Sequence, residues 1–224
     1  TLRRLPPNHP DRGFLEGQAR VFASFNARGE TRAETEQQEL NPAYLRTVEA
    51  LKKARLTVFP IEPKSLGQMA AGDDKRHFDY INPSEALRKV VPEAATVAID
   101  THQMRIRNSN NRTKAQQIVM IEKWGEDLKQ KTGLTDKDIL VRMPHASEAS
   151  QLDIVYQEAN QGEKLCPDFR VCTLDETVGP GIAAVGRDRP GRRLDVDYWD
   201  AVFGYPSIWA SPVVVILHQK LKIG

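Results

Sequence analysis

Hydrophobic and polar residues follow one another along the chain in blocks that predict helices and strands in turn. Apolar side chains three and four positions apart predict a helix over residues 42–52, with Asn41 and Pro42 suited to its first turn. An apolar run over 56–61 follows directly and predicts a strand. The same succession then recurs, and it predicts a helix over 83–90, a strand over 96–100, a helix over 111–131 closed by Gly133, and a strand over 138–143.

The two ends of the chain are less regular. β-forming residues predict a strand over 19–25, followed by a polar, Glu-rich connection, and two apolar runs predict strands over 169–174 and 213–217. Glycines, prolines and charges predict a loop over 179–193. Strands that alternate with helices predict an α/β fold, with a mixed or largely parallel sheet and flanking helices.

The domain organisation follows from the same pattern. We expect an irregular N-terminal arm over residues 1–18 and one α/β domain over 19–178. A C-terminal segment over 179–224, made of the loop and an aromatic-rich stretch, is expected to pack on that same domain.

Composition adds limits on partners and location. The chain has 224 residues, of which 40% are hydrophobic and 28% charged, as in folded globular proteins. Lys and Arg exceed Asp and Glu by 32 to 30, so any basic site must be local. The longest apolar run, over 213–217, is far shorter than the roughly 20 residues of a membrane helix, so no membrane partner is expected. A cytoplasmic location is slightly favoured, and secretion would require a signal that has been removed.

An acid, a histidine and a cysteine are the candidate catalytic residues. Asp100 and His102 follow the strand predicted over 96–100, and the ends of strands are where ligand crevices form in α/β sheets. A carboxylate beside an imidazole suits general-base chemistry, although Asp100 would equally cap the following turn. Cys166 and Cys172 are the two cysteines; they form a disulfide in an oxidising compartment and stay thiols, buried and inert, in the cytoplasm.

Two basic stretches are candidate phosphate-binding sites, because the arginine guanidinium group pairs with phosphate through two hydrogen bonds. Neither stretch contains interleaved aromatic residues, which argues against single-stranded nucleic-acid binding by these stretches, and a solvated charged loop is the alternative for both. Their residues are Arg105, Arg107, Arg112 and Lys114 in the first, and Arg187, Arg189, Arg192 and Arg193 in the second.

Aromatic residues gather near the C-terminus, between Tyr198 and Trp209. Core packing of this segment accounts for such a cluster, and any part of it that is exposed would suit a contact with a protein partner. Motifs of the common nucleotide-binding loops, zinc proteases, serine hydrolases and calcium-binding loops do not occur in the sequence.

Residues 96–144 resemble a strand, helix and strand unit in the C-terminal catalytic domain of protein-arginine deiminases. The residues that carry the likeness are Thr96 to Asp100, Ile121, Glu122, Leu128, Lys129, Thr132 to Thr135, Asp138, Ile139 and Pro144. The resemblance implies a pentein-type α/β propeller and hydrolysis of peptidyl-arginine to citrulline, usually with calcium. It also implies a nucleophilic cysteine, but this sequence lacks the family's cysteine motif near the C-terminus, and its His-x-Asp sequence occurs only at His9 in the arm.

A second resemblance covers residues 50–61, which are similar to a helix and strand of von Willebrand factor A-type domains. These are doubly wound α/β adhesion modules. Their metal-binding Asp-x-Ser-x-Ser motif is absent from the sequence.

Two functions are therefore expected. The first is a guanidine-modifying hydrolase, active or inactive, in which Cys166 attacks the guanidinium carbon, Asp100 holds the substrate and His102 protonates the departing ammonia. The alternative is a non-enzymatic module of a larger assembly that binds phosphate, nucleic acid or protein through its basic loops and aromatic cluster.

Overall fold

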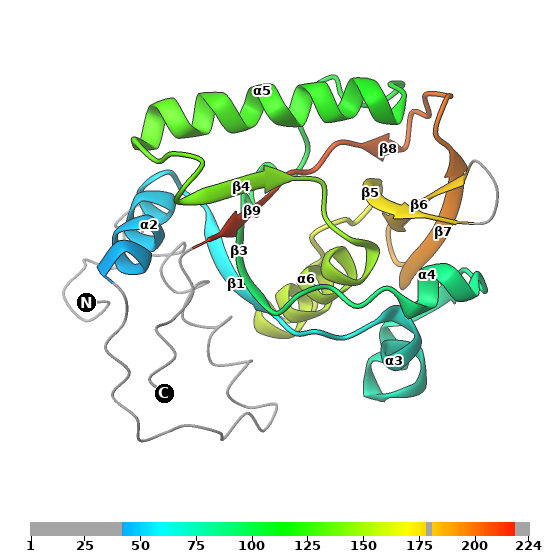
Figure 1. Ribbon diagram of the computed structural model, residues 1–224. Coiled ribbons are helices and arrows are strands. Elements are labelled where there is room, and N and C mark those ends of the chain that lie inside the picture. The colour runs from blue at the N-terminus through cyan, green and yellow to red at the C-terminus, as the bar shows by residue number, and fades with distance from the viewer. Residues whose placement is uncertain (1–41, 178–180, 218–224) are drawn as a thin grey trace, which may run out of the picture.

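The computed structural model describes residues 42–177 and 181–217. The N-terminal arm, the strand expected over 19–25 and the polar connection after it lie outside the described residues. The remainder is a mixed α/β structure with two sheets and flanking helices (Figure 1).

The first sheet has four strands, all antiparallel, in the order β1-β3-β9-β4. Its strands come from both halves of the described chain, since β9 inserts between β3 and β4. Helix α2 (Pro42–Lys53) precedes the sheet and packs on it through Leu51. The strands are β1 (Thr57–Ile61), β3 (Ala95–Ile99), β4 (Ile139–Arg142) and β9 (Val213–Ile216), each near its expected position.

The second sheet has five strands in the order β2-β7-β6-β5-β8. Pairing is parallel at its two outer pairs, β2 with β7 and β5 with β8, and antiparallel between them. The expected mixed sheet is therefore found in the second sheet, whereas the first sheet is antiparallel throughout. The described residues form no propeller and no closed barrel. The strands are β2 (Phe78–Ile81), β5 (Arg170–Glu176), β6 (Gly181–Gly186), β7 (Leu194–Asp200) and β8 (Ile208–Trp209).

Helix α6 (Ala146–Ala159) lies between the two sheets and is buried along nearly its whole length (Figure 1). Its apolar side chains share one core with β1 and β3 of the first sheet and with β5, β6 and β7 of the second. The helix begins at His145, whose backbone N–H donates to the Glu148 carboxylate at 2.7 Å. Because α6 packs against both sheets, it joins them into one packed unit.

Helix α5 (Lys114–Thr132) covers β4 on the outside of the first sheet (Figure 1). A capping box at Thr113 starts the helix, and Gly133 ends it in the left-handed conformation with φ of 71°. Gly125 faces β4 so closely that a Cβ there would lie 3.0 Å from the Cβ of Val141. The absence of a side chain at Gly125 thus sets the distance between helix and sheet.

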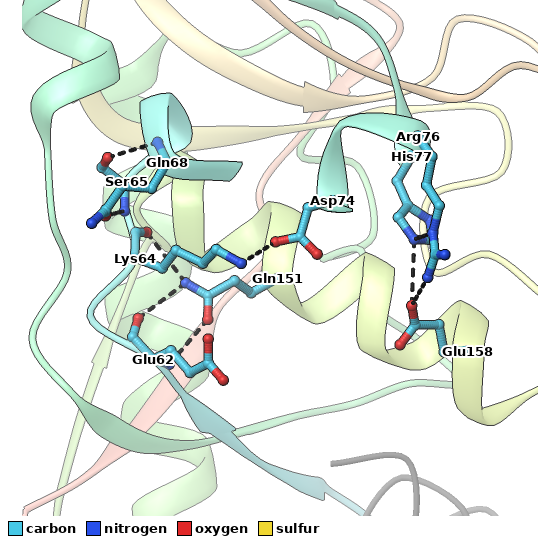
Figure 2. A network of polar contacts seen from close by, with 9 residues as sticks. All are labelled: Glu62, Lys64, Ser65, Gln68, Asp74, Arg76, His77, Gln151 and Glu158. Atoms are coloured by element: carbon cyan, nitrogen blue, oxygen red, sulfur yellow. Dashed lines mark hydrogen bonds and ion pairs between the residues drawn. The ribbon is translucent and has the colours of Figure 1, made fainter. Parts of the chain in front are cut away.

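Three short helices and strand β2 connect β1 to β3, and a polar network fastens this connection to α6 (Figure 2). Lys64 pairs with Asp74 at 2.5 Å, while the Gln151 side chain on α6 bonds both the N–H and the carbonyl of Glu62. Further along α6, Glu158 accepts from Arg76 at 3.2 Å. The short helices are α3 (Leu66–Ala71), η2 (Asp73–His77) and α4 (Glu85–Lys89).

Several elements differ from the sequence-based expectation. The loop predicted over 179–193 is wrong in part, because residues 181–186 form β6, a central strand of the second sheet. Two glycines and two alanines make up most of β6, and these small residues give a weaker strand signal than bulky β-forming residues do. The pattern also failed to predict α3, α6, β2, β7 and β8. Among the described helices, none combines the length and the apolar character needed to cross a membrane.

Candidate binding pocket

A pocket of about 400 Å³ opens where the segment after β3 meets the loop before β5 and strand β8. This volume falls within the range of small-molecule sites. Three separate parts of the chain form its wall: residues 101–107, residues 164–169 and Trp209. The lining residues are Thr101, His102, Gln103, Met104, Arg105, Arg107, Lys164, Leu165, Pro167, Phe169 and Trp209.

Arg105 is held in this pocket by two aromatic rings. Its guanidinium carbon lies 4.5 Å from the ring centroid of Phe169 and 4.8 Å from that of Trp209. Such cation–π contacts are favourable in themselves and restrict the planar guanidinium group to a small set of orientations. The N–H donors at the edge of the group remain suited to an acceptor from a ligand.

The lining is positively charged. Arg105, Arg107 and Lys164 contribute cations and His102 an imidazole, whereas no Asp or Glu occurs among the described residues that line the pocket. Burial, and secondly the charge of Arg187, lower the pKa of Lys164. Its ammonium group donates to the carbonyl of Arg192 at 2.5 Å. Cations gathered on one low-dielectric wall raise the local concentration of anions.

Asp100 shapes the segment that carries His102 and Arg105. One of its carboxylate oxygens accepts from the backbone N–H of His102 at 3.0 Å and of Gln103 at 2.8 Å. This is the turn-capping role that was the alternative to a catalytic one. It bends the chain at the end of β3, so that the residues that follow line the pocket.

A buried ion pair supports the opposite wall. Arg187 donates to both carboxylate oxygens of Asp153, at 2.9 and 2.7 Å, and the two side chains are 0% and 1% exposed. The same carboxylate accepts from the backbone N–H groups of Leu165 and Cys166 at 3.1 and 3.2 Å. Asp153, on α6, therefore fixes the position of the loop that lines the pocket.

Cys166 lies behind this wall, and Cys172 lies on β5; both are free thiols and buried. Burial raises the pKa of Cys166 well above its ordinary value, and it raises the pKa of Cys172 to about 12. The sulfur of Cys166 contacts the Met104 sulfur at 3.8 Å. At neutral pH such a thiol is protonated, which makes it a poor nucleophile.

The remaining basic residues do not reach the pocket. Lys114 donates to the carbonyl of Leu174, and Arg189 is exposed beyond β6. Arg192 and Arg193 both pair with Asp79 on β2, at 3.1 and 2.7 Å. Hydrogen bonds from Arg193 are the main cause of the lowered pKa of Asp79. The expected second basic stretch is thus divided, with Arg187 in the core and the other three arginines outside the pocket lining.

The aromatic cluster is also divided. Trp209 lines the pocket, and Trp199 is buried with its ring 5.7 Å from that of Tyr205, edge to face. Tyr198, Phe203 and Tyr205 are exposed by 63%, 59% and 40%. Core packing therefore accounts for only part of the cluster.

Some features of the site were missed by the sequence reasoning. Lys164 and Phe169 carry no local signal, because only the packing of their loop against Arg105 gives them a role. A histidine–carboxylate pair lies outside the pocket lining: His145 bonds Asp175 through Nδ1 at 2.7 Å, and this hydrogen bond raises the pKa of His145 against the effect of burial.

The part of the chain that the structure describes brings together no group of three or more His, Cys, Asp or Glu side chains able to hold a metal ion. Comparison of the chain with protein-family models, curated proteins and solved structures finds no match in any of the three.

Proposed function

We propose that this chain is a non-enzymatic binding module that takes a phosphate-bearing ligand in the pocket lined by Arg105 and Arg107. The observation that carries the proposal is the stacking of Arg105 between Phe169 and Trp209 in a wall without carboxylates. A pre-oriented guanidinium group loses little freedom on binding, and its paired donors match two oxygens of a phosphate.

The proposal is tested by calorimetric titration with inorganic pyrophosphate at low salt. Arg105→Gln should weaken binding by about 10-fold or more, since a charge-assisted hydrogen bond contributes about 1.5–3 kcal/mol and 1.4 kcal/mol is tenfold. Arg189→Gln is the matched control, because Arg189 is exposed and does not line the pocket. No measurable pyrophosphate binding by the wild-type chain, or equal binding by Arg105→Gln, would refute the proposal.

The guanidine hydrolysis implied by the deiminase resemblance is the second candidate. It is favoured by one observation: Cys166 lies between Leu165 and Pro167, which line the same pocket as His102. The raised pKa of Cys166 and the cationic lining weigh against it, because the substrate guanidinium is itself a cation. The pentein-type propeller and the calcium requirement belong to this candidate alone.

Mass spectrometry of an arginine-containing peptide mixture, with and without calcium, separates the two functions. Citrulline that forms with the wild-type chain and not with Cys166→Ala would support hydrolysis. If neither condition yields citrulline, the hydrolase is rejected and the binding module stands on the pyrophosphate titration.

A further inference from the structure

Two segments far apart in the sequence lie side by side next to the pocket. The N–H of Ile106 donates to the carbonyl of Ala210 at 3.0 Å, and the N–H of Asn111 donates to the carbonyl of Tyr205 at 3.0 Å. Gly204 lies so close that a Cβ there would be 2.3 Å from the carbonyl carbon of Asn111. Residues 105–112 and 203–210 thus run alongside each other in opposite directions.

These two segments carry complementary chemistry. The first contributes arginines and the second contributes aromatic rings, beginning at the pocket with Arg105 and Trp209. The arginines of the first segment are Arg105, Arg107 and Arg112. None of them forms an ion pair with any residue in the described ranges 42–177 and 181–217. We call the set the arginine–aromatic track, and its members are Arg105, Arg107, Arg112, Trp209, Tyr205 and Phe203.

We infer that the arginine–aromatic track binds single-stranded nucleic acid, with one phosphate group in the pocket and unpaired bases on the exposed rings. This inference rests on the proposed function of the pocket. Basic side chains beside solvent-exposed aromatic rings are the combination that sequence-tolerant single-strand binders use. A duplex hides its base faces, so the rings would add nothing to its binding.

Nearby acids define where the track ends. Asp200 lies at the end of β7 and accepts from the N–H of Val202 at 3.1 Å, and Asp197 accepts from the N–H of Tyr198 at 2.8 Å. Carboxylates repel a phosphate backbone, so we exclude Tyr198, which directly follows Asp197, and end the track at Phe203, whose N–H donates to the carbonyl of Asp200.

The test is fluorescence anisotropy with labelled oligo(dT) at low salt. Oligonucleotides of about 2, 6 and 12 residues bracket the lower part of the site-size range for such binders. We expect affinity to increase with length beyond the dinucleotide and to fall steeply with salt. Duplex DNA of equal length should bind more weakly than the single strand.

Phe203→Ala is the decisive variant, because Phe203 is 59% exposed and its removal leaves no buried cavity. It should weaken binding of the longest oligonucleotide by on the order of 10-fold to 100-fold, the loss typical of one stacked base. The matched control is Tyr80→Ala, since Tyr80 is 44% exposed on β2, at the edge of the second sheet opposite β8. Circular dichroism should show both variants folded.

The outcomes distinguish this inference from the proposal on which it rests. Pyrophosphate binding that depends on Arg105, together with oligonucleotide affinity that ignores both length and Phe203→Ala, would overturn the track and leave the pocket. Binding of neither probe would overturn both. If the wild-type chain self-associates and Phe203→Ala abolishes this while oligonucleotide binding is unchanged, the rings form a protein contact and the inference is overturned as well.

Discussion

The Asp153 and Arg187 pair provides a strong test of how the pocket wall is held, because its removal has a calculable cost. Asp153→Ala leaves the Arg187 guanidinium in the core with only the carbonyls of Cys166 and Arg192, at 3.0 and 2.9 Å, as acceptors. Breaking a buried ion pair by removing one partner costs about 3–5 kcal/mol. The N–H groups of Leu165 and Cys166 lose their acceptor too, which favours the upper part of that range.

The assay is urea unfolding followed by circular dichroism at neutral pH. With a slope of about 2 kcal/mol per molar urea, a loss of about 4 kcal/mol lowers the unfolding midpoint by about 2 M. Asp136→Ala is the matched control, because Asp136 pairs with Lys129 at the surface with its side chain 88% exposed. An exposed pair contributes about 0–1 kcal/mol, so this variant should unfold near the wild-type midpoint.

Two further variants make the reasoning falsifiable even if Asp153→Ala does not fold. Asp153→Asn keeps the shape and one acceptor, and it should lose less stability than Asp153→Ala. The double variant Asp153→Leu with Arg187→Met removes both charges and should recover most of the loss. A cost for Asp153→Ala as small as that of Asp136→Ala would refute the buried pair as the support of the wall.

Three other predictions concern α5 and the start of α6. Gly133→Ala should lower the free energy of unfolding by about 1 kcal/mol, because φ at Gly133 is 71°. An added Cβ would meet no atom within 4 Å, so the loss measured by thermal melting comes from backbone strain alone. Gly125→Leu should lower the free energy of unfolding by about 1–3 kcal/mol, because the new side chain overpacks against Val141. Adding Val141→Ala should restore part of this stability. If urea unfolding shows no restoration, the contact between Gly125 and Val141 is contradicted. The pKa of His145 is raised above 6.5 by Asp175, so protonation stabilises the fold: this contribution is full below pH 6.5 and is lost as pH rises through the folded pKa. Across this pH range the free energy of unfolding of the wild type should fall as pH rises, and His145→Gln should lack this dependence. Identical pH dependence in the two proteins would contradict the prediction.

Elements with a one-sided or uninterrupted apolar pattern were predictable from the sequence. Helix α2 buries one stripe against the first sheet, and β1, β3 and β9 are short apolar runs, so their periodicity reports their burial directly. The end of α5 was predictable because Gly133 supplies the left-handed conformation there.

Helix α6 was not predictable for a physical reason. It is buried on nearly all sides, so it has no polar face to set a period of 3.6 residues. Three of its buried polar side chains read as surface residues in the sequence but have partners outside the helix: Glu148 pairs with Arg142, Asp153 with Arg187, and Gln151 with the backbone of Glu62. Only the two sheets packed around α6 supply these partners.

The candidate site, like the fold, was predictable from the sequence only in part. The sequence by itself determined the α/β class, the near-neutral charge and the positions of Arg105, Arg107 and His102 after a strand. The tertiary structure decided which of the basic residues share a pocket, since Arg187 is ion-paired with Asp153 in the core and Arg192 and Arg193 pair with Asp79.

The basic stretches contain no interleaved aromatic residues, which argued against single-stranded nucleic-acid binding, but the fold brings aromatic rings to Arg105 from elsewhere in the chain. Phe169 and Trp209 lie far from Arg105 along the chain and meet its guanidinium group only because β5 and β8 pair beside the segment after β3. Sequence patterns report the burial of a residue relative to its near neighbours. A pocket depends on contacts between distant segments, and those are fixed by how the two sheets pack on α6.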